Sequence, residues 1–373
     1  MTLSDKESRM ADDYSFEYVF PAIKGVQAKQ EYYISMCPIR LLPRMFLFDE
    51  ADIPAEMRAQ RRLNANRIPE MKRYILDNLD TYVFSAITAS IDGDVQFKPY
   101  SEAENRMGTL RISMDATFVI NDGQHRRAAI EEALKENPDF ANETIAVVFF
   151  IDADLKRCQQ MFSDLNRYAI RPSKSLGILY DYRDDFSLLT KEIIARSDFF
   201  KNVVEMEKSS LSPRSRKLFT LSALYSATKA LLKNVDGDGE SLVELGVKFW
   251  ESTANQLKEW KLVNENRLTA GEVRGDYIHS HSIALHALGI AGNTLIKNHP
   301  KRWQTKLKKL SSIDWARSNS TVWEGRTLVG GMIHKAANNV VLTSNYIKTN
   351  LGLDLTPEEL KAEKAFLKGH NGN

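Results

Sequence analysis

The chain has 373 residues, and its 43% hydrophobic and 27% charged residues are typical of a soluble globular protein with one large or two ordinary domains. A formal net charge of +2 at pH 7 excludes binding of nucleic acid through bulk charge, so any such contact depends on local basic patches. Residues 1–13 are polar and acidic, unlike a signal peptide, and no stretch of about 18 apolar residues occurs. We therefore expect a cytoplasmic protein without a membrane span.

The cysteines and histidines do not have the spacing of a metal site. Cys37 and Cys158 are too few for a disulfide framework and form no Cys-x-x-Cys pair. His279 and His281 are two residues apart, and on a helix such side chains do not face one another. We expect two free, buried thiols and no metal, zinc or haem site.

The first elements expected in chain order are two strands, residues 14–21 and 27–38, joined as a hairpin near Gly25. An arginine-rich stretch follows at residues 58–73, and Pro69 suits the first turn of a helix there. The apolar face of that helix is expected to consist of Met71, Tyr74, Ile75 and Leu79. The basic residues are either a solvated face or the approach to a phosphate site. They are Arg58, Arg61, Arg62, Arg67, Lys72 and Arg73.

The middle of the chain predicts strands around one helix. Residues 84–91 alternate like a strand with a polar face, and residues 110–114 and 117–120 predict two more strands. After residue 120 come turn residues, and a helix is expected as far as Lys135. The apolar run 144–151 then predicts a strand covered on both faces. This order indicates a βαβ-like unit with its site at the carboxyl end of the first strand.

The turn around Gly123 has the features of a phosphate site, because a glycine between a strand and a helix exposes backbone N–H groups to an anion. The candidate phosphate-binding residues are Gly123, Gln124, His125, Arg126 and Arg127. If the protein is an enzyme, Asp122 would orient Mg²⁺ or water and His125 would be the general base. The alternative is that Asp-Gly is an ordinary turn between a strand and a helix, and that Arg-Arg lies on a solvated helix face. The turn lacks the Lys-Ser/Thr of a P-loop and the further glycines of a dinucleotide fingerprint.

Residues 122–126 read Asp-Gly-Gln-His-Arg, the signature of the DGQHR-domain family, and the chain is similar to the DndB branch of that family. The stretches 25–27, 60–67, 162–166 and 172–176 agree with this resemblance. It implies a ParB/sulfiredoxin-like fold in which a comparable turn holds the phosphates of ATP or another nucleoside triphosphate with Mg²⁺. In such folds the arginine-rich segment, here Arg61, Arg62 and Arg67, leads toward the nucleotide.

The resemblance also implies a function. DndB proteins repress their own DNA phosphorothioate modification genes, which makes double-stranded promoter DNA the expected partner, with other DNA-modification proteins beside it. A regulator that reads a palindrome favours a homodimer. The alternative is a ParB-like ATP or NTP hydrolase with a DNA-nicking activity, acting as an accessory enzyme of DNA sulfur modification, in which Asp122 and His125 are catalytic.

From about residue 180 helical periodicity replaces strand patterns. The expected fold is an α/β (α+β) ParB/sulfiredoxin-like domain over residues 14–180, followed by a mostly α-helical domain over residues 181–367. Single helices are expected at residues 242–262 and 278–296, the second tightly packed because it is rich in small residues.

Two basic stretches of the second half are candidate DNA contacts. Residues 212–217 are expected to initiate a helix that continues to Leu232, and basic residues at a helix start suit phosphate. Residues 297–310 hold six Lys or Arg and no acid. They contact a duplex or form the solvated side of an amphipathic helix whose apolar residues are Trp303, Leu307 and Leu310. The candidate DNA-binding residues are Arg214, Arg216, Lys217, Lys301, Arg302, Lys306, Lys308 and Lys309.

Overall fold

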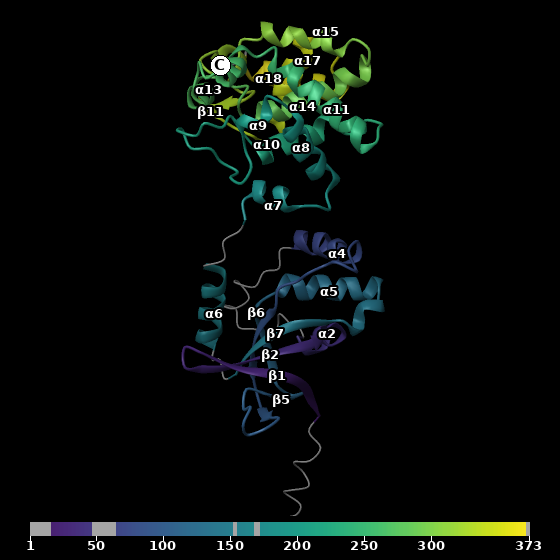
Figure 1. The fold of residues 1–373 in the computed structure, drawn as a ribbon, viewed down its shortest axis with the longest axis vertical. Helices are drawn as coiled ribbons and strands as arrows, with labels where there is room; N and C mark the ends of the chain where they lie inside the picture. Colours follow the sequence, from purple (N-terminus) through teal and green to yellow (C-terminus); the bar gives the residue numbers. More distant parts are fainter. Residues whose placement is uncertain (1–15, 47–64, 152–154, 168–171, 371–373) are drawn as a thin grey trace, which may run out of the picture. The chain divides into compact units, whose positions relative to one another are not determined.

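The computed structural model of the chain describes residues 16–46, 65–151, 155–167 and 172–370. It forms two compact units, Met1–Ile170 and Arg171–Asn373 (Figure 1). The division falls before the boundary expected at residue 180. The reason is that α7 (Lys174–Tyr180) packs against the helices after it in the chain.

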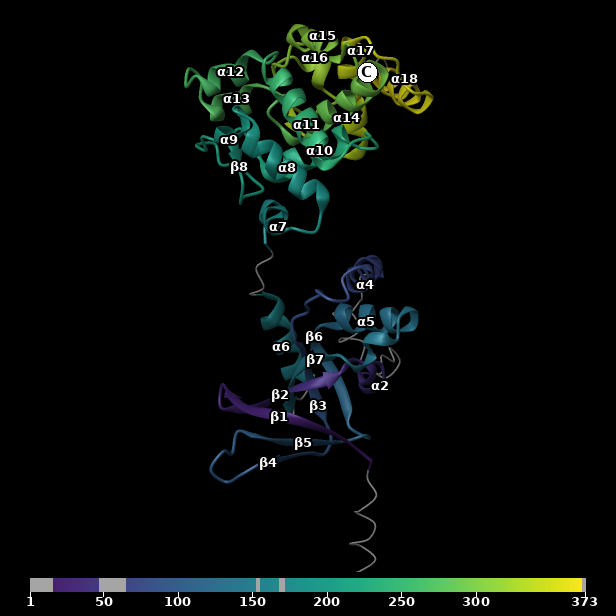
Figure 2. The ribbon, with the colours of Figure 1, turned by 45° about the vertical axis from the view of Figure 1, so that its right-hand side comes forward.

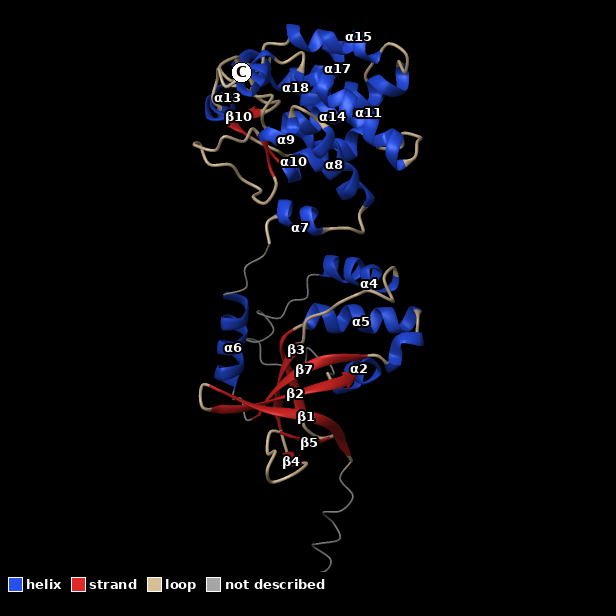
Figure 3. Ribbon diagram, viewed as in Figure 1, coloured by secondary structure: helices blue, strands red, loops and turns tan. Residues whose placement is uncertain are grey.

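The first unit is built on a seven-stranded sheet with the order β4-β5-β1-β2-β7-β3-β6 (Figure 3). Its strands are β1 (Glu17–Gln27), β2 (Gln30–Pro38), β3 (Ile87–Asp92), β4 (Val95–Pro99), β5 (Met107–Ser113), β6 (Thr117–Asp122) and β7 (Thr144–Ile151). Neighbouring strands are antiparallel, except that β3 and β7 are parallel. The architecture is therefore mixed α/β.

The sheet curls so that its two ends approach each other. Residues 114–116 alone join β5 to β6, although β6 lies at one end of the strand order and β5 near the other. Rings from distant strands accordingly meet in the interior. The Phe118 ring of β6 has its centroid 5.9 Å from that of Tyr18 on β1 and 6.2 Å from that of Phe149 on β7.

The β1–β2 hairpin forms as expected, but its turn lies further along the chain. Gln27 pairs with Gln30, and the two residues between them, Ala28 and Lys29, have φ of 52° and 64°. Two positive φ values are the geometry of a type I′ turn, whose twist matches that of the flanking strands. Gly25 is therefore part of β1 and not of the turn.

The expected βαβ-like unit is wrong in its pairing. β3 lies between β6 and β7, antiparallel to β6 and parallel to β7, so β6 and β7 run in opposite directions. The expected double coverage of β7 is also wrong, because Ile145, Val147 and Phe149 are buried while the residues between them are only half-buried. An apolar run predicts a strand, but neither its burial on both faces nor the direction of its neighbours.

The first unit also contains α-helices and short 3-10 helices (η). They are η1 (Ile39–Leu41), α2 (Leu42–Met45), η2 (Ala65–Arg67), α4 (Ile68–Leu76), α5 (Gln124–Glu136), η3 (Asp139–Asn142) and α6 (Leu155–Arg167). Pro69 lies in the first turn of α4 as expected, and Ile75 is fully buried. Helices α4 and α5 lie side by side, as the views in Figures 1 and 2 both show.

The second unit is mostly helical. Besides α7 its helices are α8 (Asp185–Arg196), α9 (Phe200–Val203), α10 (Leu221–Leu231), α11 (Gly239–Ala254), α12 (Lys258–Asn264), α13 (Ala270–Asp276), α14 (Ser282–Asn298), α15 (Trp303–Leu307), η4 (Lys308–Ser312), α16 (Ser320–Trp323), α17 (Ala337–Leu351) and α18 (Pro357–His370). Two short pairs of strands accompany them, β8 (Val204–Glu205) with β9 (Phe219–Thr220), and β10 (Leu328–Val329) with β11 (Met332–Ile333).

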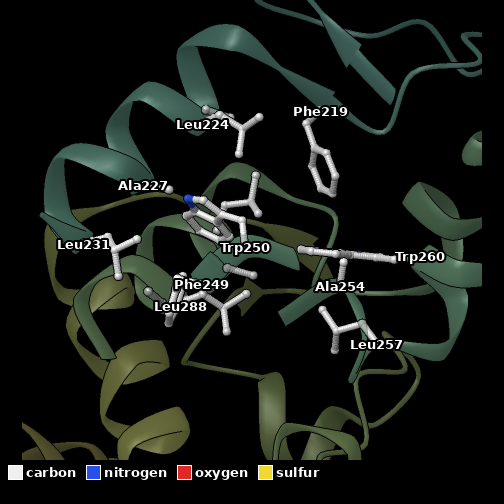
Figure 4. Close-up of a cluster of buried hydrophobic side chains, with 14 of the residues drawn as sticks. Phe219, Leu224, Ala227, Leu231, Phe249, Trp250, Ala254, Leu257, Trp260 and Leu288 are labelled. Atoms are coloured by element: carbon white, nitrogen blue, oxygen red, sulfur yellow. The ribbon is translucent and has the colours of Figure 1, made fainter. Parts of the chain in front are cut away.

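Aromatic side chains fill the core of the second unit (Figure 4). Trp250 and Trp260 are fully buried, and the ring centroids of Trp260 and Phe219 are 4.8 Å apart. The tight packing expected around α14 is confirmed. A Cβ added at Gly289 would lie 2.2 Å from the carbonyl oxygen of Ala227 on α10.

Three helix predictions for this unit need correction. The helix expected at residues 242–262 is two helices, α11 and α12, which a turn at residues 255–257 separates. Residues 212–217 form a loop, and α10 starts only after Thr220, whose side chain accepts a hydrogen bond from the Ala223 N–H. Residues 297–310 span the end of α14, a turn, α15 and part of η4. Among the residues that the structure describes, no helix has the length and apolarity to span a membrane.

Candidate functional site

The turn between β6 and α5 is built around Gly123. This residue is the N-cap of α5 with φ of 108°, in the left-handed region that favours glycine. A Cβ there would lie 3.0 Å from both Arg126 Nη2 and Ile87 Cγ1. Because glycine has no side chain to cap the helix, the N–H groups of the first turn are left for another acceptor.

Arg126 ties the turn to the sheet. Its Nη2 donates to Asp122 Oδ2 at 2.7 Å and to the carbonyl oxygen of Ala86 at 2.9 Å, just before β3. The Arg126 side chain is 17% exposed, whereas that of Asp122 is 44% exposed. The guanidinium thus points inward, and the carboxylate is the more accessible group of the pair.

Arg127 and Gln124 also face the interior. Arg127 is buried and its Nη2 lies 3.0 Å from Glu131 Oε2. Burial lowers the pKa of Arg127. The Gln124 amide is buried and donates to the carbonyl oxygen of Ile120 at 3.3 Å. Both side chains, expected to bind phosphate, therefore already have a protein partner.

Three polar atoms of this region are buried without a hydrogen-bond partner among the described residues. They are Asn121 Oδ1, Arg126 Nε and Arg127 Nε. Two of the three are donors of positively charged groups at the first turn of α5. Unsatisfied buried donors are costly, and an anion is the acceptor that suits them best. We call this first turn, together with Asp122 and Gly123, the α5 turn.

His125 and Arg67 lie at the exposed side of the α5 turn. Arg67 is exposed and ends η2, directly before α4. Burial and then the positive charges of Arg67 and Arg126 lower the pKa of His125, while Asp122 raises it. These effects favour the neutral imidazole, and Arg67 brings its charge to the same place. Arg61 and Arg62, expected beside it, lie outside the described residues.

A buried pair behind the turn was not recognised from the pattern. Asn121 Nδ2 donates to Ser90 Oγ of β3 at 2.7 Å, and both residues are buried. The polar alternation of residues 84–91 pointed to such a pair, because a serine that is buried in a strand needs a hydrogen-bond partner. The pair fixes the end of β6 and hence the direction in which the α5 turn leaves the sheet.

The basic stretches of the second unit differ in their surroundings. Arg214 and Arg216 are exposed, while Lys217 Nζ donates to the carbonyl oxygen of Asn202 at 2.9 Å. In the other stretch Lys301, Arg302, Lys308 and Lys309 are exposed. Lys306 Nζ donates to the carbonyl oxygen of Gly352 at 3.2 Å. Trp303, Leu307 and Leu310 are buried as expected.

A family model described as DndB, DNA-sulfur modification-associated, matches residues 20–354. The chain belongs to the DndB family. The match includes both units, so the α5 turn and the basic stretches of the second unit both lie within the part of the chain that the family shares. This confirms the resemblance found in residues 122–126 and connects the protein with DNA sulfur modification. No curated protein and no solved structure matches the chain.

Proposed function

We propose that this DndB-family protein is a DNA-binding transcriptional regulator, a repressor of a DNA phosphorothioate modification gene cluster. The observation that supports it is a family match that includes the α5 turn of one unit and the exposed arginines of the other. Promoter DNA is the proposed partner, with a homodimer if the operator is a palindrome. Other proteins of DNA modification are further proposed partners.

In this proposal the α5 turn binds a nucleotide in a ParB/sulfiredoxin-like manner. The residues fit a phosphate, because Arg126 Nε and Arg127 Nε are buried donors without an acceptor and Gly123 leaves no side chain in the way. Arg67 would add a charge from the solvent side. ATP or another nucleoside triphosphate is the proposed ligand. Its Mg²⁺ would neutralise phosphate charge, with Asp122 as the carboxylate that the turn itself offers.

A second candidate function is an NTP hydrolase that also has a DNA-nicking activity. It is favoured by the proximity of Asp122 to His125, because burial and the charges of Arg67 and Arg126 lower the pKa of this imidazole while the Asp122 carboxylate raises it. A neutral imidazole can accept a proton from an attacking water. In this role Asp122 would hold the imidazolium that forms.

The experiment compares Arg67→Ala with Arg73→Ala, a matched control on the last turn of α4 that is also exposed. We expect Arg67→Ala to weaken binding of a fluorescent ATP analogue about tenfold, the loss of one charge-assisted contact. We expect Arg73→Ala to bind it normally, and both to bind promoter DNA at saturating nucleotide.

Three outcomes separate the candidates. Promoter binding without turnover supports the regulator. ATP turnover that His125→Ala abolishes, with the fold intact, moves the hydrolase ahead. The absence of both nucleotide and promoter binding contradicts both functions.

A further inference from the structure

A long basic loop joins β8 to β9 in the second unit. Its residues 208–217 read Lys-Ser-Ser-Leu-Ser-Pro-Arg-Ser-Arg-Lys and contain four basic residues and no acid. Loops of this length without secondary structure are uncommon in compact domains and are often functional. We call residues 208–217 the basic loop.

Arg274 of α13 holds this loop in place. Its Nη2 donates to the carbonyl oxygens of Ser212 at 2.7 Å, Pro213 at 3.2 Å and Ser215 at 3.2 Å. Its Nη1 donates to the carbonyl oxygens of Ser215 and Lys217. One guanidinium group thus donates hydrogen bonds to four carbonyl groups within six consecutive residues.

The neighbouring turn of α13 is shaped to receive the loop. A Cβ added at Gly271 would lie 2.4 Å from the carbonyl oxygen of Pro213, which is closer than any side chain allows. Arg274 and Gly271, one turn apart on α13, therefore define where the loop backbone lies. This contact is independent of the sequence of the loop, because only its backbone is involved.

The arrangement determines where the loop side chains go. Since the carbonyls of Ser212, Pro213, Ser215 and Lys217 turn toward Arg274, the side chains of Arg214 and Arg216 project into solvent, and both are exposed. Their charge is not neutralised, because neither forms an ion pair with an acid in the described part of the chain. Because the backbone that carries these two guanidinium groups is already held in place, binding does not have to order the loop itself.

Within the described residues, Arg274 also has no carboxylate partner. All of its hydrogen bonds go to carbonyl oxygens, and burial lowers the pKa of Arg274. It lines a cavity of about 370 Å³ between the loop and the first turn of α14. Ser209, Ser210 and Ser282 line the same cavity, and the Ser209 hydroxyl is also hydrogen-bonded to Ser175. A cationic, hydroxyl-rich surface of this kind suits phosphate oxygens.

We propose that the basic loop, held by Arg274 as a positioning residue, binds the phosphate backbone of double-stranded DNA through Arg214 and Arg216. This inference rests on the DNA-binding function proposed above and assigns its principal contact in the second unit. Backbone phosphates are chosen over base edges because the loop offers charge and hydroxyls on an open surface, which position a protein without reading sequence. Lys217 is not part of the proposed contact, because its ammonium donates to the carbonyl oxygen of Asn202, which holds its side chain against α9.

The test measures how the affinity of the full-length protein for a labelled duplex depends on salt concentration. The slope of log K against log salt concentration is negative, and each lost phosphate contact reduces its magnitude by about 0.9. A lower slope here means a smaller magnitude. We expect Arg214→Ala/Arg216→Ala to lower the slope by about 2 and to weaken binding roughly 60-fold at 0.1 M salt. Lys361→Ala/Lys364→Ala, which removes two exposed charges from α18 of the same unit, is the matched control and should change the slope much less.

Arg274→Gln tests the positioning role. This variant keeps Arg214 and Arg216 but removes the guanidinium that binds the loop carbonyls. We therefore expect a smaller slope and an unchanged circular dichroism spectrum. If Arg274→Gln does not fold, Gly271→Ala displaces the same loop backbone and gives the same readout. A wild-type slope in Arg214→Ala/Arg216→Ala overturns the loop contact alone. A wild-type protein that binds no DNA overturns the proposed function as well.

Discussion

At the residue scale, Gly123 determines whether the α5 turn can form. We expect Gly123→Ala to lower the free energy of unfolding by about 1–3 kcal/mol, because it combines a strained positive φ with contacts at 3.0 Å to Arg126 and Ile87. The displaced Arg126 should also reduce nucleotide binding. Urea unfolding of both proteins measures the difference. Gly177→Ala, at a helical position with nothing within 4 Å, is the control and should be neutral or slightly stabilising.

His281 gives a second prediction at this scale. Burial, aided by Arg317 and His279, lowers the pKa of His281 to about 4, against the opposing bond between its ring Nε2 and the Arg274 carbonyl. In the unfolded chain the imidazole titrates near 6.5, so between pH 6.5 and pH 4 only the unfolded state binds the proton. The free energy of unfolding contributed by this group is therefore fully present above pH 6.5 and falls as the pH falls, by up to about 3 kcal/mol.

The measurement is urea unfolding at pH 7 and pH 4.5 for the wild type and His281→Gln. Gln keeps a donor for the carbonyl but does not titrate, so the variant should lose less stability on acidification. An equal loss in the two proteins would show that His281 does not contribute to the pH dependence.

At the residue scale, the motif predicted the turn correctly but did not predict the partners of its arginines. Gly between a strand and a helix predicted the break, and β6, Gly123 and α5 follow that order. The inward direction of Arg127 was available from helix phase, because it shares a face with the buried Ile130 and the half-buried Leu134, three and seven positions later. The bond from Arg126 to Ala86 was not available, since the partner is 40 residues away.

At the element scale, a largely buried ion pair between Arg326 and Glu363 helps to hold α18. Arg326 donates to both carboxylate oxygens of Glu363 at 2.6 and 2.8 Å, and its guanidinium carbon lies 4.3 Å from the centre of the Phe366 ring. Both members of the ion pair are largely buried. Removing one partner of such a pair leaves an uncompensated charge, which costs several kcal/mol.

We expect Glu363→Gln to destabilise the protein by about 3 kcal/mol and to speed amide exchange throughout α18, because the Arg326 charge is then unpaired. Hydrogen–deuterium exchange followed by mass spectrometry measures this. Lys361→Gln, an exposed charge change on the same helix, should leave exchange unchanged. Normal protection of α18 in Glu363→Gln would show that the helix is held without the Arg326–Glu363 ion pair.

Elements with a strong hydrophobic pattern could be predicted from the sequence, whereas elements whose form depends on residues far along the chain could not. The apolar run of β7 and the small residues of α14 are local signals, and both elements formed. Ser212-Pro213 looks like a helix start, yet Arg274 takes the carbonyl groups of this segment from about 60 residues away along the chain. The order of the strands likewise depends on β3, which enters between β6 and β7 from an earlier part of the chain.

At the scale of the whole molecule, each unit has a hydrophobic core of its own. The buried cluster of the first unit runs from Phe20 to Phe149, and that of the second from Ile178 to Leu353. No residue of either cluster comes from the other unit, as far as the described residues extend. The chain therefore has the organisation expected of two domains that can fold separately.

We expect residues 172–373 expressed alone to fold, with one cooperative thermal transition followed by circular dichroism at 222 nm, because the aromatic core around Trp250 and Trp260 is complete within them. If the basic loop is the principal phosphate contact, this fragment should keep salt-dependent duplex binding and lose it in Arg214→Ala/Arg216→Ala. Nucleotide binding should be absent, since the α5 turn belongs to the other unit. A fragment that folds but binds no duplex would move the DNA contact to the first unit, and one that does not fold would show that the second core depends on the first.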